Sequence, residues 1–334
     1  MTQDAPAAVP RETAQPRWLY RRGELARDGW ESVVDAATPG WQHTGLRVAE
    51  LGVGEELHFP AHTVHGHAVE RIVVPLAGSF LVEHSAGEPV ALAGRASVFH
   101  GPSDVLYLPG GTSGAVRASG SGEGGRARVA IAEAPVHTAA ARPLRHVRAD
   151  EVAIELRGAG SASRQVHNFG TPGNLDAAKL IVCEVITPAA NWSSYPAHKH
   201  DEQRPGQESE LEEIYYFEAA PSRRAHPPAS TAAAAAAAAA KSAAFGMFAA
   251  YSSPGKPIDI NGLVSSGDIA LVPHGYHGPA AATPDYDLYY LNVMAGPGDE
   301  RAWLISDDPN QSWVRDGWAV QRIDERLPYL PAKG

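Results

Sequence analysis

One short pattern occurs twice in this chain, once in each half. Residues 104–111 read Asp-Val-Leu-Tyr-Leu-Pro-Gly-Gly, and residues 268–275 read Asp-Ile-Ala-Leu-Val-Pro-His-Gly. Upstream, Glu70 precedes an apolar run in the first half, as Glu213 does in the second. The runs are short, rich in strand-favouring residues and bounded by turn residues. This internal repeat predicts two copies of one β-rich unit.

The second half also carries residues suited to a metal centre. His198 and His200 are two positions apart, so on an extended strand both side chains point to the same side. A polar, acid-rich loop follows, after which Glu213 opens the apolar run, and His277 lies just beyond a Pro-x-Gly turn. Three imidazoles and one carboxylate suit Zn, Mn or Fe. The sequence therefore predicts one divalent metal per chain, with open positions for substrate.

The first half lacks a complete ligand set. It contains His65 and His67, but the position that matches His277 is Ser113. We therefore expect the first copy to support the second without binding a metal. In the second half, His-x-His, the strand-opening Glu and Gly-x5-Pro-x-Gly-x-His together resemble the two motifs of the cupin barrel. This resemblance implies an all-β fold of two cupin barrels (double-stranded β-helices, or jelly rolls) with few short helices.

The expected organisation follows from these motifs. The segments are a flexible N-terminal arm over residues 1–20, an N-terminal barrel without a complete metal site over 21–145, a C-terminal barrel with the metal site over 146–315, and a tail over 316–334. Residues 229–244 form an alanine-rich insertion in the second barrel. Alanine favours helix, so we expect an exposed helix or a poorly ordered loop without a chemical role.

Charge and cysteine content exclude several classes of protein. A net charge of −10 argues against nucleic acid or an anionic membrane as a partner. The single cysteine, Cys183, excludes an intramolecular disulfide and fits a reducing compartment. No signal peptide is recognisable, and no apolar run has the length of a membrane span. We expect a soluble, cytoplasmic protein.

One glycine-bounded polar segment, residues 158–170, is unlike a core strand. Its Arg164 is suited to binding a carboxylate in a bidentate pair. An ordinary surface loop with one salt bridge is the competing interpretation.

Longer blocks of sequence narrow the function. They cover residues 163–170, 191–201, 211–216, 271–277 and 286–297. These blocks resemble the 5-deoxy-glucuronate isomerase family of myo-inositol catabolism, a two-cupin family. The resemblance covers nearly the whole chain, although the family has a short loop where this chain has its alanine-rich segment.

The resemblance implies a metal-dependent aldose–ketose isomerase that converts 5-deoxy-D-glucuronate into 5-dehydro-2-deoxy-D-gluconate through an enediol. The implied metal ligands are His198, His200, Glu213 and His277, with Glu212 as the alternative to Glu213. It also suggests a homo-oligomer, in which the tryptophan-bearing tail could form part of the interface.

Such a reaction needs a base to move the proton next to the carbonyl and a group to hold the substrate's carboxylate. The candidate bases are Glu208, Glu210, Glu212, His274, Tyr276 and Tyr289, and the sequence does not choose among them. Of these, Glu212, His274 and Tyr289 are taken as the predicted catalytic residues. Arg164, Lys199 and Tyr276 are predicted to bind the substrate, with Arg164 preferred for its fork of N–H donors. No organic cofactor is expected.

Two other functions fit the same ligand set. One is a metal-dependent dioxygenase, and the other is a cupin that binds a sugar without chemistry. No helix-turn-helix or basic segment accompanies the barrel, which disfavours a sugar-sensing regulator. Only the sequence blocks outside the metal motifs disfavour the dioxygenase, because ligand identity alone does not define a reaction.

Overall fold

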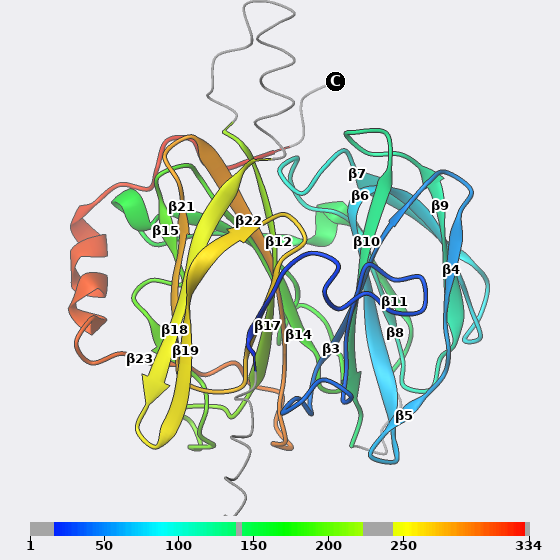
Figure 1. Ribbon diagram of the computed structural model, residues 1–334, viewed down its shortest axis with the longest axis horizontal. Helices are drawn as coiled ribbons and strands as arrows, with labels where there is room; N and C mark the ends of the chain where they lie inside the picture. The colour runs from blue at the N-terminus through cyan, green and yellow to red at the C-terminus, as the bar shows by residue number, and fades with distance from the viewer. Residues whose placement is uncertain (1–16, 138–141, 223–242, 331–334) are drawn as a thin grey trace, which may run out of the picture.

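The structure is a computed structural model that describes residues 17–137, 142–222 and 243–330. Strands dominate it and form two barrels that lie side by side (Figure 1). The all-β, two-barrel prediction is confirmed. Residues 1–16 of the predicted arm and residues 229–242 of the predicted alanine-rich insertion lie outside the described ranges.

The N-terminal barrel is a ten-stranded sheet folded on itself. Its strands are β2 (Ser32–Val34), β3 (Gly45–Leu51), β4 (Glu56–Phe59), β5 (Thr63–Val64), β6 (His67–His84), β7 (Val90–Arg95), β8 (Val105–Leu108), β9 (Gly114–Gly120), β10 (Ala127–Pro135) and β11 (Arg145–Val147).

The C-terminal barrel contains a seven-stranded and a six-stranded sheet. The first consists of β1 (Leu19–Tyr20), β12 (Ala153–Arg157), β13 (Arg164–Gly170), β14 (Ile181–Thr187), β17 (Glu212–Pro221), β20 (Ile269–Val272) and β22 (Tyr286–Ala295). The second consists of β15 (Trp192–Ser193), β16 (His198–Lys199), β18 (Phe245–Ser253), β19 (Lys256–Ser265), β21 (Tyr276–Ala282) and β23 (Ser306–Asp307). Three short 3₁₀ helices accompany them: η1 (Ala149–Glu151), η2 (Gly160–Ala162) and η3 (Ser312–Val320).

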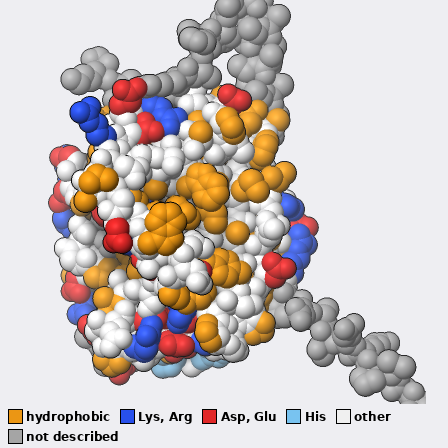
Figure 2. Space-filling view, turned by 90° about the vertical axis from the view of Figure 1, so that its left-hand side faces the viewer, with side chains coloured by type: hydrophobic (Ala, Val, Ile, Leu, Met, Phe, Trp, Pro, Cys, Tyr) orange, Lys and Arg blue, Asp and Glu red, His pale blue; other side chains and the backbone are white. Residues whose placement is uncertain are grey.

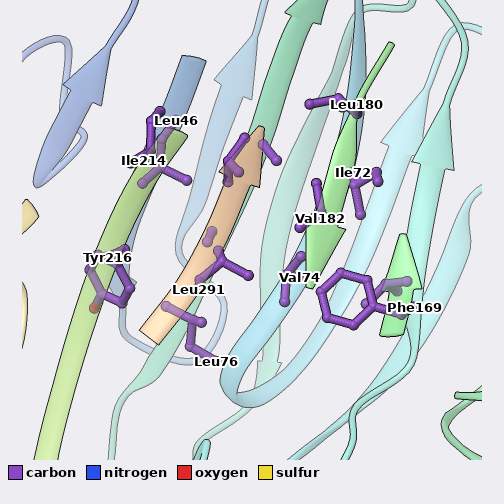
Figure 3. Packing of buried hydrophobic residues seen from close by; sticks show 14 of the residues in the cluster. Leu46, Ile72, Val74, Leu76, Phe169, Leu180, Val182, Ile214, Tyr216 and Leu291 are labelled. Carbon is purple, nitrogen blue, oxygen red and sulfur yellow. The ribbon is translucent and has the colours of Figure 1, made fainter. Parts of the chain in front are cut away.

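Two sheets pack face to face between the barrels and share one apolar core (Figure 3). Strand β14 shows how the sequence builds this arrangement. Val182 and Ile186 face the shared core, whereas Ile181, Cys183 and Val185 face the interior of the C-terminal barrel. Side chains alternate along a strand, so a strand that is apolar at successive positions can serve two cores at once.

Polar contacts cross the interface between the barrels in a reciprocal way. In β6, Glu70 accepts hydrogen bonds from the backbone N–H groups of residues 178–180, at 2.6–2.8 Å. In β17, Glu212 accepts hydrogen bonds from the backbone N–H groups of Gln42 and His43. Each barrel therefore supplies one glutamate that satisfies backbone donors of the other. We call these the reciprocal glutamate contacts.

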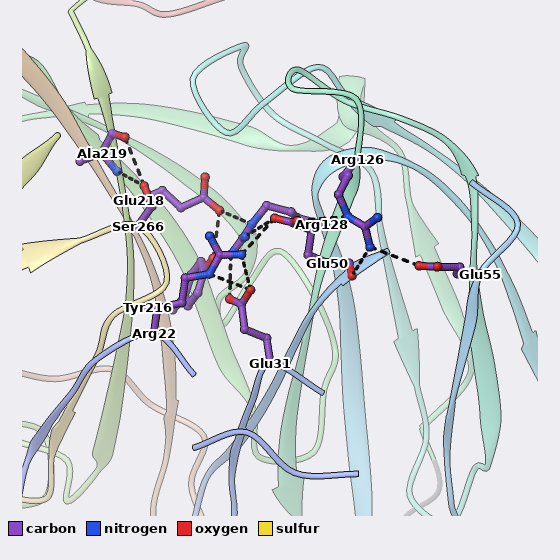
Figure 4. A network of polar contacts seen from close by, with 10 residues as sticks. All are labelled: Arg22, Glu31, Glu50, Glu55, Arg126, Arg128, Tyr216, Glu218, Ala219 and Ser266. Carbon is purple, nitrogen blue, oxygen red and sulfur yellow. Dashed lines mark hydrogen bonds and ion pairs between the residues drawn. The ribbon is translucent and has the colours of Figure 1, made fainter. Parts of the chain in front are cut away.

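Arginines join the barrels at two further places. Arg95 of β7 makes a buried ion pair with Glu184 of β14, with both N–O distances at 2.6 Å. Arg128 of β10 contacts Glu50 of its own barrel and Glu218 of β17, and it donates to the hydroxyl of Tyr216 (Figure 4). The two barrels are therefore held together by charge as well as by apolar packing.

The register of the strands corrects the predicted alignment of the two halves. Arg71 pairs with Leu108, and Glu213 pairs with Val272. Because residues 108 and 272 are equivalent in the repeat, the residue that matches Glu213 is Arg71 and not Glu70. Glu70 instead matches Glu212, which explains why the reciprocal glutamate contacts are symmetric.

Arg71 is fully buried inside the first barrel, where its Nε lies 2.7 Å from Glu133 Oε1. It also donates to the carbonyl oxygens of Thr112 and Pro60. A guanidinium group therefore occupies the position that the carboxylate of Glu213 has in the second half.

Two predicted boundaries are also corrected. Leu19 and Tyr20, predicted as part of a flexible arm, pair with β20 of the C-terminal barrel. Strand β11 pairs with β8, so the N-terminal sheet extends to Val147 rather than to residue 145. In the tail, Tyr329 is buried and donates to Asp287 of β22, which attaches this segment to the C-terminal barrel.

Among the described residues, no helix has both the length and the apolar character required to cross a membrane.

Candidate metal centre

Three buried side chains meet inside the C-terminal barrel. His200 follows β16, Glu213 lies in β17 and His277 lies in β21. Glu213 Oε2 is 2.9 Å from His200 Nε2 and 3.1 Å from His277 Nε2. In the part of the chain that the structure describes, this is the one group of three or more His, Cys, Asp or Glu side chains close enough to share an ion.

The orientation of the imidazoles suits metal binding. His200 Nδ1 lies 3.1 Å from the carbonyl oxygen of Leu211, and His277 Nδ1 lies 3.1 Å from that of Gly275. A carbonyl only accepts, so Nδ1 of each ring carries a proton, and each ring turns its Nε2 toward Glu213. Carbonyl contacts of this kind also orient histidine ligands in metal proteins.

His198 lies at the edge of this group. Its ring centroid is 4.5 Å from that of His277 and 6.3 Å from that of His200. Its Nδ1 also faces a carbonyl, that of Pro196, at 3.4 Å. Burial lowers the pKa of His198 well below its usual value, and His277 and His200 act in the same direction. A neutral imidazole beside the cluster is suited to be a further ligand.

These residues fit a divalent ion. Two ligands that are each about 2.1 Å from one ion lie about 3 Å apart at a right angle, which is close to the separations found around Glu213. His277 Nε2 is buried without a hydrogen-bond partner among the described residues. Burial alone would raise the pKa of Glu213, but its contacts with His200 and His277 lower it well below the usual value. The ligand oxygen is therefore ionised.

Asp201 holds the turn at Gly275, which precedes His277, in place through hydrogen bonds. One carboxylate oxygen of Asp201 accepts from the N–H of Gly275 at 2.9 Å and from the hydroxyl of Ser253. The other oxygen accepts from Lys199 Nζ. Gly275 has a φ of +91°, and an added Cβ would lie 2.4 Å from Ile258 Cγ2. The local sequence therefore needs glycine at this position.

A cavity of about 210 Å³ reaches the cluster at Glu213 and at the neighbouring His198. Its lining residues are Arg157, Arg164, Val166, Val185, Ser194, His198, Glu213, Tyr215, Tyr290, Asn292, Trp303, Ile305 and Arg315. The seven-stranded sheet supplies the floor, and the segment around β23 and η3 supplies the outer wall.

Positive charge is concentrated in this cavity. Arg157 and Arg164 stand directly opposite each other on β12 and β13. Glu155 neutralises Arg157 through two contacts of 2.8 Å. Arg164 is 5% exposed, contacts the carbonyl oxygens of Ala162 and Tyr195, and has no acidic partner within 4 Å among the described residues. Burial lowers the pKa of Arg164 to about 10, so it remains charged at neutral pH.

Segment 158–170 was expected to be unlike a core strand, which is wrong for its second part, and it is not the ordinary surface loop of the competing interpretation. Residues 164–170 form strand β13. Because side chains alternate along a strand, Arg164 and Val166 face the cavity while the residues between them face the other way. Arg164 is the predicted substrate-binding residue that the structure places in the cavity.

The other predicted substrate-binding residues lie elsewhere. Lys199 points away from the cavity because it alternates with His198 and His200, and it forms ion pairs with Asp201 at 2.5 Å and Glu208 at 2.8 Å. Tyr276 alternates with His277 in the same way and stacks on Tyr251.

None of the candidate bases lines the cavity. Glu208 pairs with Lys199, and Glu210 is exposed. Glu212 makes the reciprocal glutamate contact, and burial raises its pKa to about 7. His274 Nε2 lies 2.9 Å from the carbonyl oxygen of Pro257.

Tyr289 lies on the far side of β22, where its hydroxyl donates to Glu184 at 2.7 Å within the shared core. Together with Tyr276, which also lies outside the cavity, these residues were chosen by type. The alternation along each strand directs them to other surroundings.

Sequence reasoning missed several residues that line the cavity. Asn292 and Tyr290 of β22 face inward, and the amide nitrogen of Asn292 is buried without a partner among the described residues. Trp303 and Arg315 come from the segment that follows β22. The sequence did contain a signal for Tyr290 and Asn292, because residues two apart on a strand share a face.

Comparison with known proteins gives a consistent result. The sequence profile of the KduI/IolB family matches residues 18–314. A 5-deoxy-glucuronate isomerase from Geobacillus thermodenitrificans is 34% identical over 284 residues, which cover 85% of this chain and 90% of the relative. The crystal structure of an IolB-like protein from Salmonella typhimurium LT2 matches with a TM-score of 0.72 and 32% identity, covering 89% of this chain and 99% of that protein.

A more distant structure supports the fold alone. Oxalate decarboxylase from Lactobacillus farciminis matches with a TM-score of 0.53 at 10% identity, over 91% of this chain and 90% of that protein.

Proposed function

Because the chain belongs to the KduI/IolB family, we propose that it converts 5-deoxy-D-glucuronate into 5-dehydro-2-deoxy-D-gluconate. The chain is an enzyme, an aldose–ketose isomerase. The specific substrate, the metal dependence and an enediol route through the centre described above are the content of the proposal.

One observation carries the proposal: the cavity is lined both by Glu213 of the candidate metal cluster and by Arg164, a buried arginine with no acidic partner among the described residues. A buried unpaired charge is costly, so Arg164 is suited to a ligand that brings a carboxylate. A sugar acid with a carbonyl at one end and a carboxylate at the other matches the two features of the cavity.

Each part of the cavity then has a role. His198, His200, Glu213 and His277 would hold a divalent ion such as Zn, Mn or Fe. When bound, such an ion polarises a carbonyl oxygen and stabilises the negative charge that develops as the neighbouring proton moves. Arg164 orients the substrate through its carboxylate, and Trp303 helps to exclude water from the cavity.

The test compares wild type with His200→Ala and Arg164→Met. Metal content is measured by elemental analysis, and turnover of 5-deoxy-D-glucuronate is followed by NMR. We expect His200→Ala to lose metal and turnover together. Arg164→Met should keep its metal but raise KM for the sugar acid, because it removes the carboxylate contact without removing a proposed metal ligand.

Other outcomes would contradict the proposal. Metal-loaded wild type that leaves the sugar acid unchanged would refute the assigned reaction. Oxygen consumption with a catechol or thiol substrate would then favour the dioxygenase, and sugar binding without turnover would favour a non-catalytic role. Metal content that is unchanged in His200→Ala would refute the assigned ligands.

We also propose that the chain forms a homo-oligomer in the cytoplasm. Apolar side chains gather on the outer face of the C-terminal barrel (Figure 2). Exposed large apolar residues of its elements include Trp192 in β15, Met247 in β18, and Trp313 and Val320 in η3. Contiguous apolar surface is typical of protein contacts. Sedimentation equilibrium would test the oligomer, and a monomer at micromolar concentration would contradict it.

A further inference from the structure

The side chains on the cavity floor form rows, each made of paired residues on neighbouring strands, and the polarity of these rows differs along the strands. Arg164 marks one end. Two residues further along β13, Val166 faces the same way and pairs with Val185 of β14, which pairs in turn with Tyr290 of β22. The next row along β14 and β22 contains Asn292, which is opposite Tyr215 of β17. Glu213 lies two residues from Tyr215, at the metal centre.

Two of the three residues in the row beside Arg164 are valines. Val166 is 1% exposed and Val185 is 5% exposed, and both line the cavity. Neither side chain can donate or accept a hydrogen bond. The third member, Tyr290, has its hydroxyl 3.3 Å from Ser194 Oγ. The nearby Arg157 is already bound to Glu155.

The row beside the metal centre is polar. The amide nitrogen of Asn292 is buried and has no partner in the described part of the chain. The hydroxyl of Tyr215 lies 3.2 Å from Ser194 Oγ. This row therefore offers the amide of Asn292 to a ligand, whereas the side chains of Val166 and Val185 offer neither a donor nor an acceptor.

We propose that the Val166–Val185 pair selects substrates whose carbon next to the carboxylate bears no hydroxyl. The inference rests on the proposed function and adds the reason for the preference. With the carboxylate at Arg164 and the carbonyl at the metal centre, the carbon next to the carboxylate lies against the two valines. Asn292 then faces the hydroxyls further along the substrate.

The physical reason is desolvation. A hydroxyl on that carbon would lose its hydrogen bonds to water and would face valine side chains, which cannot replace them. The loss of these hydrogen bonds makes binding less favourable. A methylene group there meets apolar side chains at no such cost. Because an apolar pocket rejects an added hydroxyl only moderately, we expect a preference of about tenfold to a hundredfold.

The experiment uses two acids that differ only at this carbon: D-gluconate, which has a hydroxyl next to the carboxylate, and 2-deoxy-D-gluconate, which does not. Dissociation constants are measured by calorimetry on wild type, Val185→Thr and Val166→Thr, with the metal present and after chelation. The control is Val264→Thr, a buried valine of the same barrel that does not line the cavity. Thermal unfolding of each variant establishes that it is folded.

We expect wild type and Val264→Thr to bind the deoxy acid more tightly by about tenfold or more. In Val185→Thr and Val166→Thr the preference should approach parity, because the new hydroxyl offers a partner. The same ratio should appear in kcat/KM for 5-deoxy-D-glucuronate against D-glucuronate.

The outcomes separate this inference from the proposed function. If wild type isomerises the deoxy sugar acid but both cavity variants keep the full preference, the valine pair is not the selecting feature. Equal binding of the two acids to wild type would overturn the inference in the same way. If wild type neither binds these acids nor isomerises the sugar acid, the proposed function itself fails.

Discussion

The direction of each imidazole decides what the centre can bind. The backbone carbonyl oxygens of Leu211 and Gly275 accept hydrogen bonds from the Nδ1–H groups of His200 and His277, respectively. These contacts cannot be removed by changing a side chain, but the backbone that makes them can be moved. Gly275 is the point at which a single substitution would do so.

We predict that Gly275→Ala lowers metal affinity about tenfold to a hundredfold, the range for lost support of a ligand. The added Cβ would clash with Ile258 and shift the turn that orients His277. The control is Gly255→Ala, which also has positive φ, at +75°, but has open space around the new Cβ. Competition with a chromogenic chelator measures the affinity, and equal loss in both variants would contradict the prediction.

The residue types of the centre were readable from the sequence, whereas their surroundings were not. The two-residue spacing of His198 and His200 predicted a common face, and the motifs added Glu213 and His277. The structure brings His200, Glu213 and His277 within contact. Lys199 and Tyr289 had suitable chemistry too, but they alternate onto faces where Asp201, Glu208 and Glu184 bind them. Which partner a side chain meets depends on strand pairing, which single-sequence patterns do not give.

Among the elements, the segment around β23 and η3 has the least expected role. It does more than cover the barrel, because Trp303, Ile305 and Arg315 form one wall of the cavity. The ring of Trp318 lies under two arginines, 5.3 Å from Arg164 and 5.0 Å from Arg315. The strands were predictable from short apolar runs between turns, but this long-range packing of an irregular segment was not.

We predict that Trp318→Ala raises KM for the sugar acid severalfold with a smaller change in kcat. Loss of the ring removes cation–π contacts of about 0.5–2 kcal/mol and loosens Arg164. Steady-state kinetics measures both constants. Trp313→Ala in the same helix is the control, since Trp313 is 68% exposed and contacts neither arginine. A KM change of equal size in the control would refute the prediction.

Across the whole molecule, the reciprocal glutamate contacts make each barrel dependent on the other. Glu70 serves three backbone N–H groups of the C-terminal barrel and also accepts from Tyr107 of its own barrel at 2.6 Å. We predict that Glu70→Ala lowers the free energy of unfolding by about 1–3 kcal/mol or more, because it leaves buried donors unpaired. Denaturant titration measures this, and Glu83→Ala, at an exposed site, should change it by less than about 0.5 kcal/mol.

The ion pair between Arg95 and Glu184 predicts how the assembled barrels respond to acid. Burial alone would raise the pKa of Glu184, but Arg95 and His167 outweigh this effect and lower it to about 2. A lowered pKa stabilises the fold above the ordinary value of 4.5, and this contribution is lost as the pH falls toward 2. We predict that Glu184→Gln is less stable at neutral pH but loses less stability than wild type over this window. Parallel pH curves from denaturant titrations would contradict the prediction.

Arg71 makes the two barrels differ in where the positive charge in their interior comes from. The first barrel carries a buried cation as part of the chain, neutralised by Glu133, whereas the metal site proposed in the second must acquire its ion. If that proposal holds, the charge balance inside the first barrel does not depend on the supply of trace metals in the cell. A shortage of the ion would then act on the second barrel alone, where its return would restore the site.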